Sequence, residues 1–364
     1  MTRVEKLAEL IEKDSGSAPQ VTGYATAAEL ADALLGDQVD AVIMNGASIA
    51  LLIEEEDYET FLDQVRILYS VSYDTLDGKD TSATESTDPI DPEKNVTNTP
   101  FVVYVSGSDT RSSVLDVSRS DVNILMVVNP LTKQVLLLNT PRDYYVGNPA
   151  GDGALDKLTH CGLYGVDCSM EALEGLYGAD IKYYGQINFT GFETLIDAIG
   201  GITVYSDQSF TARDTYIQKG ENTLNGTQAL DFSRERYHVS GGDNGRGKNQ
   251  MKVITAVIKK MTTGTTVISN YSAIMSSLEG MFSTNLPTSD ISMLVKMQLN
   301  DLATWDVFSF AVTGTGGSEK TYSAPGHTAY VMYPNEESVE YASGLIKKIM
   351  SGELLTEEDM TMPE

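Results

Sequence analysis

Three short segments of this chain place an arginine close to an aspartate: GSDTR at 107–111, SRSDVN at 118–123 and TPRDYY at 140–145. Carboxylates are oxygen ligands that suit Mg²⁺, and guanidinium groups form paired bonds with phosphate oxygens. Each segment stands at the end of an expected strand, where α/β sheets place their sites. Together they suit a magnesium-bound diphosphate, although a structural Arg–Asp ion pair explains any one of them alone.

A second basic stretch lies further along the chain and contains Arg234, Arg236, Arg246 and Lys248. We expect it to lead into a helix N-terminus, where unpaired N–H groups and a partial positive charge favour an anion. A solvated basic loop is the alternative when this stretch is taken by itself.

Part of this stretch, SGGDNGRGKNQ at 240–250, comes within one residue of the nucleotide-binding loop G-x-x-x-x-G-K-[ST]. The closing position is Asn249 rather than Ser or Thr, and the preceding DFSRERYHVS is too charged for a central strand. The sequence therefore argues against an ATP or GTP site.

The formal net charge is −27, which argues against nucleic acid as a partner because duplex binding needs a basic face. No stretch approaches 18 apolar residues, and no signal peptide is visible. The abrupt start at MTRVEKLAELIEKD leads us to expect a membrane anchor upstream of the printed sequence.

Two cysteines, Cys161 and Cys168, lie in THCGLYGVDC. A disulfide that closes a short loop and a pair of free buried thiols are both open at this point. A zinc site that also uses His160 is a weaker alternative, because no second ligand pair stands nearby.

Changes in hydrophobic pattern and polarity along the sequence divide it into four parts. Residues 1–75 alternate patterns expected to form helices at 3–14, 25–38 and 47–65 with patterns expected to form strands at 39–45 and 66–73, which predicts a small α/β accessory domain. Residues 76–98 are polar and aperiodic, as in a linker or surface loop. Residues 99–350 mix strands and helices, which predicts a three-layer α/β/α sandwich with a mixed central sheet. Residues 351–364 form an expected acidic C-terminal tail.

Within 99–350 the clearest pattern is DVNILMVVNPLTKQVLLLNTPRDYYV, a hairpin of two apolar strands around Asn129-Pro130. YYGQINFTGFETLIDAIGGITVY reads strand, helix, Gly-Gly stop and strand, and NQMKVITAVIKKMTT reads as a long amphipathic helix. Further helices are expected over 267–303, then the strands WDVFSFAV and AYVMYP, and a last helix with Asn335 as its N-cap.

The order of these motifs resembles the LytR-CpsA-Psr family of cell-wall glycopolymer ligases. The segments that carry the resemblance are GSDTR, RSDVNILMVVNPLTKQVLLLNTPRDYYV, DKLTH, YYGQINFTGFETLIDAIGGITV, LNGTQALDFSRER and GDNGRGKNQMKVI. The similarity covers roughly 100–262 strongly and continues more weakly through TYSAPGHTAYVMYPNEESVEYA. Residues 1–75 resemble the accessory domain that some members carry between membrane anchor and catalytic domain.

The resemblance implies an enzyme anchored on the outer face of the membrane of a Gram-positive bacterium. Members bind a polyprenyl-pyrophosphate-linked glycan and transfer the phosphoglycan onto peptidoglycan, attaching teichoic acid, capsule or a similar polymer. By matching position, Asp109 and Asp121 are expected to hold Mg²⁺. The residues expected to bind the pyrophosphate are Arg111, Arg119, Arg142, Lys157, Arg234, Arg236, Arg246 and Gln250.

Two departures from the family pattern bear on substrate preference and rate. Where many relatives read S-D-T, this chain has Ser120-Asp121-Val122, and Asn249 stands where many have an arginine before the glutamine.

The catalytic residues expected are Asp109, Arg142 and Asp143, with Asp109 as first candidate for the general base and Asp143 as second. Arginines and magnesium would stabilise the charge that grows on the bridging oxygen as an acceptor hydroxyl attacks. A polyprenyl-pyrophosphate pyrophosphatase and a non-catalytic glycolipid-binding scaffold remain as alternatives.

Overall fold

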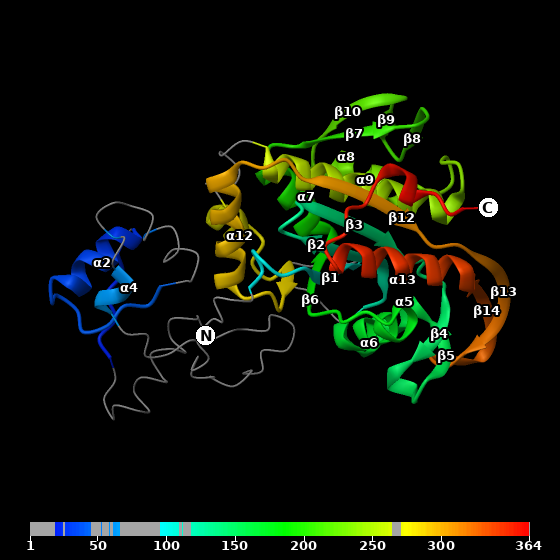
Figure 1. Cartoon of the computed structure of the whole chain (residues 1–364), viewed down its shortest axis with the longest axis horizontal. Coiled ribbons are helices and arrows are strands. Elements are labelled where there is room, and N and C mark those ends of the chain that lie inside the picture. Colours follow the sequence, from blue (N-terminus) through cyan, green and yellow to red (C-terminus); the bar gives the residue numbers. More distant parts are fainter. Residues whose placement is uncertain are drawn as a thin grey trace. The chain divides into compact units, whose positions relative to one another are not determined.

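The computed structural model describes residues 19–24, 26–44, 52, 58, 61–65, 95–108, 111, 118–263 and 271–363 (Figure 1). The chain forms two compact units, the first mainly from residues before 92 and the second from most of the rest.

In the first unit, helix α2 (Ala27–Leu35) confirms the helix expected in this segment. Thr26 caps it by accepting a hydrogen bond from the backbone N–H of Glu29 at 3.1 Å. With α4 (Phe61–Gln64) it buries a small cluster that includes Ala31 and Phe61. The strand expected at 39–45 is wrong over 39–44, which have no regular structure, and the elements expected at 3–14 and 66–73 lie outside the described residues.

The second unit is built on a six-stranded mixed sheet in the order β11-β6-β1-β2-β3-β12. The strands are β1 (Phe101–Ser108), β2 (Ser120–Asn129), β3 (Gln134–Asn139), β6 (Tyr183–Asn188), β11 (Phe282–Thr284) and β12 (Asp306–Ala311). β2 pairs antiparallel with β1 and β3, which confirms the expected hairpin, whereas β6 and β12 add in parallel to β1 and β3. β11 lies in a segment expected to be helical.

The strand directions bring one end of each of five strands to the same edge of this sheet. Ser108 pairs with both Ser120 and Asn188, so β1 ends where β2 begins and β6 ends. Asn139 pairs with Ala311, so β3 and β12 end together, and the hairpin sets Asn139 opposite Ile124 near the start of β2. We call this the site edge, because the three segments that pair an arginine with an aspartate adjoin the end of β1, the start of β2 and the end of β3.

Helices cover both faces of the sheet, which confirms the three-layer sandwich (Figure 1). Successive side chains of β2 alternate between the faces. Leu125 and Val127 pack with α6 (Val166–Tyr177) and α13 (Glu336–Met350), and Ile124 and Val128 lie in the cluster of α9 (Gly242–Thr262) and α12 (Thr288–Asp301). Asn335 caps α13 by accepting from the N–H of Ser338, as expected.

A third cluster joins α7 (Phe189–Ala198), α8 (Gly226–Arg234) and α11 (Tyr271–Ser277) to a group of short strands. The strands are β7 (Ile202–Ser206), β8 (Phe210–Ala212), β9 (Thr215–Ile217) and β10 (Gly220–Leu224). α7 starts directly after β6, so the first residue of this helix lies at the site edge.

Two hairpins complete the second unit. β4 (Tyr145–Asn148) pairs with β5 (Ala154–Lys157), which runs into the short helix α5 (Leu158–Cys161). β13 (Gly314–Thr321), which the sequence did not suggest, pairs with β14 (Ala324–Pro334).

The last residues extend the core of the second unit. Residues 351–364 were expected as an acidic tail, yet Leu355 is buried and its N–H donates to the side chain of Gln134 at 2.9 Å. The short 3-10 helix η3 (Glu357–Met360) also lies here, and Asp359 pairs with Lys348 at 2.7 Å.

Candidate functional site

The centre of the site edge is an ion pair between two of the expected residues. Arg142 lies in the turn after β3 and donates from Nη1 to Oδ1 of Asp121, near the start of β2, at 2.7 Å. Thr159 donates its hydroxyl to the same oxygen at 3.3 Å. The hairpin places its own two ends together, so two segments that seemed separate in the sequence supply one anion–cation contact.

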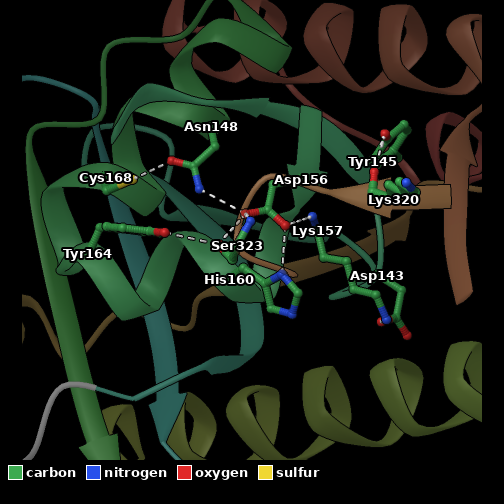
Figure 2. Close-up of polar contacts among 10 residues, drawn as sticks. All are labelled: Asp143, Tyr145, Asn148, Asp156, Lys157, His160, Tyr164, Cys168, Lys320 and Ser323. Atoms are coloured by element: carbon green, nitrogen blue, oxygen red, sulfur yellow. Dashed lines mark hydrogen bonds and ion pairs between the residues drawn. The ribbon is translucent and has the colours of Figure 1, made fainter. Parts of the chain in front are cut away.

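Lys157 and Asp143 extend this pair into a cluster. Lys157 Nζ lies 3.0 Å from Oδ1 of Asp143, and Arg142 Nε lies 3.7 Å from Oδ2 of the same carboxylate (Figure 2 draws Asp143 and Lys157). The backbone N–H of Thr159 donates to the carbonyl of Arg142 at 2.9 Å, which ties α5 to the turn. We call Asp121, Arg142, Asp143 and Lys157 the ion-pair cluster.

The four side chains of the ion-pair cluster are 13–23% exposed. They are therefore neither dry nor fully solvated, so their charges interact more strongly than at an open surface and still reach a ligand from solvent. The cluster contains two cations and two carboxylates, so its formal charges cancel. A ligand that combines an anionic group with a metal cation would therefore suit it.

Two further expected cations share one aromatic ring. Phe189 is the first residue of α7, immediately after β6, and the guanidinium carbons of Arg111 and Arg234 lie 5.9 Å and 4.3 Å from its ring centre. Glu193, one turn later, accepts from Arg111 at 3.2 Å and 3.4 Å. A ring face attracts a guanidinium, so Phe189 holds both arginines by the site edge. The sequence reasoning missed Phe189 and Glu193.

The glycine-rich stretch at 240–250 belongs to a helix, not to a loop. α9 begins at Gly242, so Arg246, Lys248 and Gln250 lie within its first turns; this corrects the expectation that the basic run precedes the helix. Gly247 packs on the end of β3, where an added Cβ would lie 2.5 Å from Nδ2 of Asn139. This contact brings Arg246 and Gln250, both partly buried, to the site edge.

Other expected residues are not brought into the ion-pair cluster. Arg119 and Arg236 are exposed, and Arg236 stacks on its neighbour Tyr237 at 4.7 Å. In the part of the chain that the structure describes, neither contacts the cluster. Asp109, the first candidate for both metal ligand and base, lies outside the described residues.

Among the described residues, Asp121 offers one carboxylate oxygen that could bind a magnesium ion. Both hydrogen bonds to Asp121 go to Oδ1, and within the described ranges its Oδ2 accepts none. A carboxylate with one oxygen fixed and the other available suits Mg²⁺, which commonly takes one or two carboxylates together with phosphate oxygens and water.

The cysteine pair has no disulfide. Cys161 and Cys168 are free and buried, and Cys168 donates to Oδ1 of Asn148 at 3.3 Å. Burial raises the pKa of Cys161, helped by the neighbouring Cys168, so this thiol stays protonated. The zinc alternative finds no support among the residues described, where no group of three metal-binding side chains occurs.

A buried carboxylate that the sequence reasoning did not single out lies behind the cluster. Asp156 is fully buried, and the Nδ1 of His160 lies 2.6 Å from its Oδ1 (Figure 2). Burial by itself would raise the pKa of Asp156. Hydrogen bonds from His160, Ser323, Asn148 and the Lys157 backbone outweigh it and lower the pKa to about 2.

Comparison with known proteins decides the family. A profile of the LytR_cpsA_psr family matches residues 68–340. The chain belongs to the LytR-CpsA-Psr family.

Among the described residues, no helix combines the length and the apolar character needed to span a membrane.

The curated relatives that this chain matches include TagU transferases. A TagU of Enterococcus faecalis, named polyisoprenyl-teichoic acid–peptidoglycan teichoic acid transferase, is 35% identical over 197 residues, or 54% of this chain and 64% of the relative. A TagU of Oceanobacillus iheyensis is 37% identical over 175 residues, or 46% of this chain and 52% of that protein. The matches thus span less than two thirds of these relatives' own length.

Solved structures support the same fold. The Lin1025 protein of Listeria innocua is 30% identical, with a TM-score of 0.57 over 70% of this chain and 100% of that one. TagT bound to LIIa-WTA is 25% identical, with a TM-score of 0.57 over 71% of this chain and 94% of that one.

Proposed function

We propose that this LytR-CpsA-Psr protein is a phosphotransferase that moves a phosphoglycan from a polyprenyl-pyrophosphate carrier onto peptidoglycan. The observation that carries the proposal is the ion-pair cluster, where Arg142 and Lys157 stand beside two carboxylates at the site edge. The names of the TagU relatives and the ligand of TagT agree with this chemistry.

Arg142 and Lys157 are proposed to bind the diphosphate. A guanidinium makes two parallel bonds to phosphate oxygens, and an ammonium adds a point charge. Arg111 and Arg234 on Phe189, with Arg246 and Gln250 on α9, would extend this binding along the same edge. Because they come from separate elements, they can surround a group as large as a glycan-linked diphosphate.

Asp121, through Oδ2, and Asp109 are the proposed magnesium ligands. Magnesium, when bound, would neutralise phosphate oxygens and favour departure of the carrier phosphate. Thr159 and Arg142 hold Oδ1 of Asp121, so the carboxylate cannot turn away from this position.

In the proposed reaction, a peptidoglycan hydroxyl attacks the phosphorus nearer the glycan. The new oxygen–phosphorus bond forms as the bond to the bridging oxygen breaks, and polyprenyl phosphate leaves. Positioning and charge stabilisation carry such phosphoryl transfers, because the protein forms no covalent intermediate. Arg142 and Lys157 would stabilise the charge on the leaving oxygen, a contribution of several kcal/mol in comparable sites.

The test is a transfer assay with the purified chain, a polyprenyl-pyrophosphate-linked teichoic acid donor and peptidoglycan. The proposal predicts magnesium-dependent release of polyprenyl phosphate together with glycan bound covalently to peptidoglycan. Equal release of free phosphoglycan with and without peptidoglycan would instead identify a pyrophosphatase. Donor binding without any product would identify a scaffold.

The natural setting proposed for this activity is the outer face of the membrane of a Gram-positive cell, where peptidoglycan is available. Teichoic acid is the proposed cargo because the TagU relatives are named for it. A capsule donor run in parallel in the same assay tests this choice, which fails if only the capsule glycan is transferred.

A further inference from the structure

Asp156 is 0% exposed, and its carboxylate accepts hydrogen bonds from several residues. Asn148 on β4 donates to Oδ2 at 3.1 Å, and the backbone N–H of Lys157 donates to Oδ1 at 2.8 Å. Ser323, between β13 and β14, donates to Oδ2 through both its backbone N–H and its hydroxyl. His160 Nδ1 completes the set, so the carboxylate is held from four directions (Figure 2).

This network fixes the tautomer of His160. Hydrogen bonds to Asp156 lower its pKa to about 2 despite the burial, so the carboxylate is ionised and can only accept. Nδ1 of His160 must therefore carry a proton, which leaves Nε2 as the basic atom of the neutral ring.

His160 stands on the same short segment as two contacts of the ion-pair cluster. Thr159, its neighbour in α5, donates to Asp121, and Lys157, at the start of α5, binds Asp143. Figure 2 shows the His160 ring below Asp156 and the Lys157 side chain running from beside Asp156 toward Asp143. The His160 side chain is 14% exposed, so part of it reaches solvent while Nδ1 is held by Asp156.

From this geometry we propose that His160 is the general base of the transfer, with Asp156 as its positioning residue; the assignment rests on the proposed function. Both carboxylates expected for this task are less suited to it. Asp143 is engaged by Lys157 on one oxygen and Arg142 on the other, so its lone pairs face cations. Asp109 is a proposed magnesium ligand, and a metal-bound carboxylate is a poor base.

The step balances without another reactant. The acceptor hydroxyl oxygen forms a bond to phosphorus, and its proton passes to Nε2 of His160. The electron pair of the breaking bond leaves with the bridging oxygen of polyprenyl phosphate. His160 then carries one positive charge beside ionised Asp156, and it returns the proton to solvent or to the departing phosphate before the next turnover.

The variant that tests the assignment is His160→Asn. The asparagine Nδ2 occupies the place of the imidazole Nδ1, so it can still donate to Asp156, while the basic Nε2 is gone. The matched control is His238→Asn, because His238 also pairs with a carboxylate, Glu235 at 3.2 Å, but is 66% exposed. Donor binding, the kcat and KM of transfer, and thermal unfolding are measured for both variants.

We expect His160→Asn to fold, to bind donor with an affinity close to wild type, and to lose roughly 100- to 10,000-fold in kcat, the range for removal of a general base. His238→Asn should transfer like the wild type. His160→Gly should recover part of its activity when imidazole is added, a response that a purely structural role of His160 would not give. Asp156→Asn should lower kcat with little change in the donor KM.

Two results would overturn the assignment separately from the proposed function. Transfer by His160→Asn at the wild-type rate contradicts the base and leaves the proposed function standing. A loss of donor binding equal to the loss of kcat shows that His160 binds substrate and takes no proton. Absence of transfer by the wild-type chain, with donor bound, contradicts the proposed function and the base together.

Discussion

Asp121 lies near the start of the β2–β3 hairpin and Arg142 just after its end, and Nη1 of Arg142 lies 2.7 Å from Oδ1 of Asp121. β2 starts at Ser120 and β3 ends at Asn139, so the hairpin returns the chain to its starting edge. The ion pair thus follows from the antiparallel pairing of β2 and β3, because Asp121 lies just before and Arg142 just after the last paired residues, Ile124 and Asn139. Each residue is anchored again by α5, through Thr159 for Asp121 and through the backbone for Arg142.

Arg142→Ala is expected to slow transfer roughly 100- to 1,000-fold while the fold is kept. Loss of a guanidinium aimed at developing charge has this effect on the rate, whereas loss of a partly exposed ion pair costs only about 1 kcal/mol of stability. Lys133→Ala is the matched control, because Lys133 pairs with Asp301 next to the start of β3, at the far end from the site edge. Normal transfer by Arg142→Ala would remove the role assigned to Arg142.

Phe189→Leu is expected to raise the donor KM with a smaller effect on kcat. Leucine keeps the apolar contact but removes the ring face on which Arg111 and Arg234 lie, at roughly 0.5–1 kcal/mol for each cation. The KM should therefore rise roughly 5- to 30-fold. Tyr216→Leu, on an exposed ring of β9, serves as control. An unchanged KM in Phe189→Leu would mean that the two arginines do not bind donor.

Gly247→Ala is expected to destabilise the protein by about 1–3 kcal/mol and to weaken donor binding. The added methyl would lie 2.5 Å from Asn139, so α9 must shift and carry Arg246 and Gln250 with it. Gly344→Ala in α13 is a sharp control, because nothing lies within 4 Å of its added Cβ and alanine favours a helix by about 1 kcal/mol. Urea unfolding that gives both variants the same sign of change would contradict the close packing.

Ionised Asp156 is expected to make the free energy of unfolding fall at acidic pH. Its pKa of about 2 in the folded protein is below the ordinary value of 3.8, so its contribution is present above pH 4 and is lost as pH falls toward 2. The shift corresponds to about 2 kcal/mol. The difference in unfolding free energy between wild type and Asp156→Asn should therefore shrink by about that amount between pH 5 and pH 2. A difference that stays constant over this interval would show that the Asp156 charge does not stabilise the fold.

The sequence predicted the parts of the site that depend on local pattern. The apolar runs on either side of Asn129-Pro130 define the β2–β3 hairpin, and the hairpin alone brings Asp121 to Arg142. The order of motifs predicted the family by resemblance, and the strand and helix periods of residues 99–350 predicted the three-layer sandwich.

Residues that act through distant contacts could not be predicted in this way. Phe189 is an ordinary aromatic residue at a helix start until Arg111 and Arg234 lie on its ring. Asp156 is buried because Ser323, 167 positions away, closes over it. The spacing of Asp156 and His160, one helical turn apart, was a signal in DKLTH that could have drawn attention to the pair.

Glycines made the secondary structure of two segments hard to predict from the sequence. The glycine-rich run at 241–247 suggested a loop, yet α9 starts within it because Gly247 gains a close contact with β3 that a side chain would block. GTGGSEKT lacks the apolar alternation of a strand, but it forms β13 because tyrosine rings of β14 pack over Gly316 and Gly317.

The most direct test of the account is a crystal structure of this chain with Mg²⁺ and a short-chain prenyl diphosphate. The account predicts diphosphate oxygens within hydrogen-bond distance of Arg142 and Lys157, with the metal on Oδ2 of Asp121. A diphosphate bound away from the site edge, with the Arg142–Asp121 and Lys157–Asp143 pairs undisturbed, would contradict it.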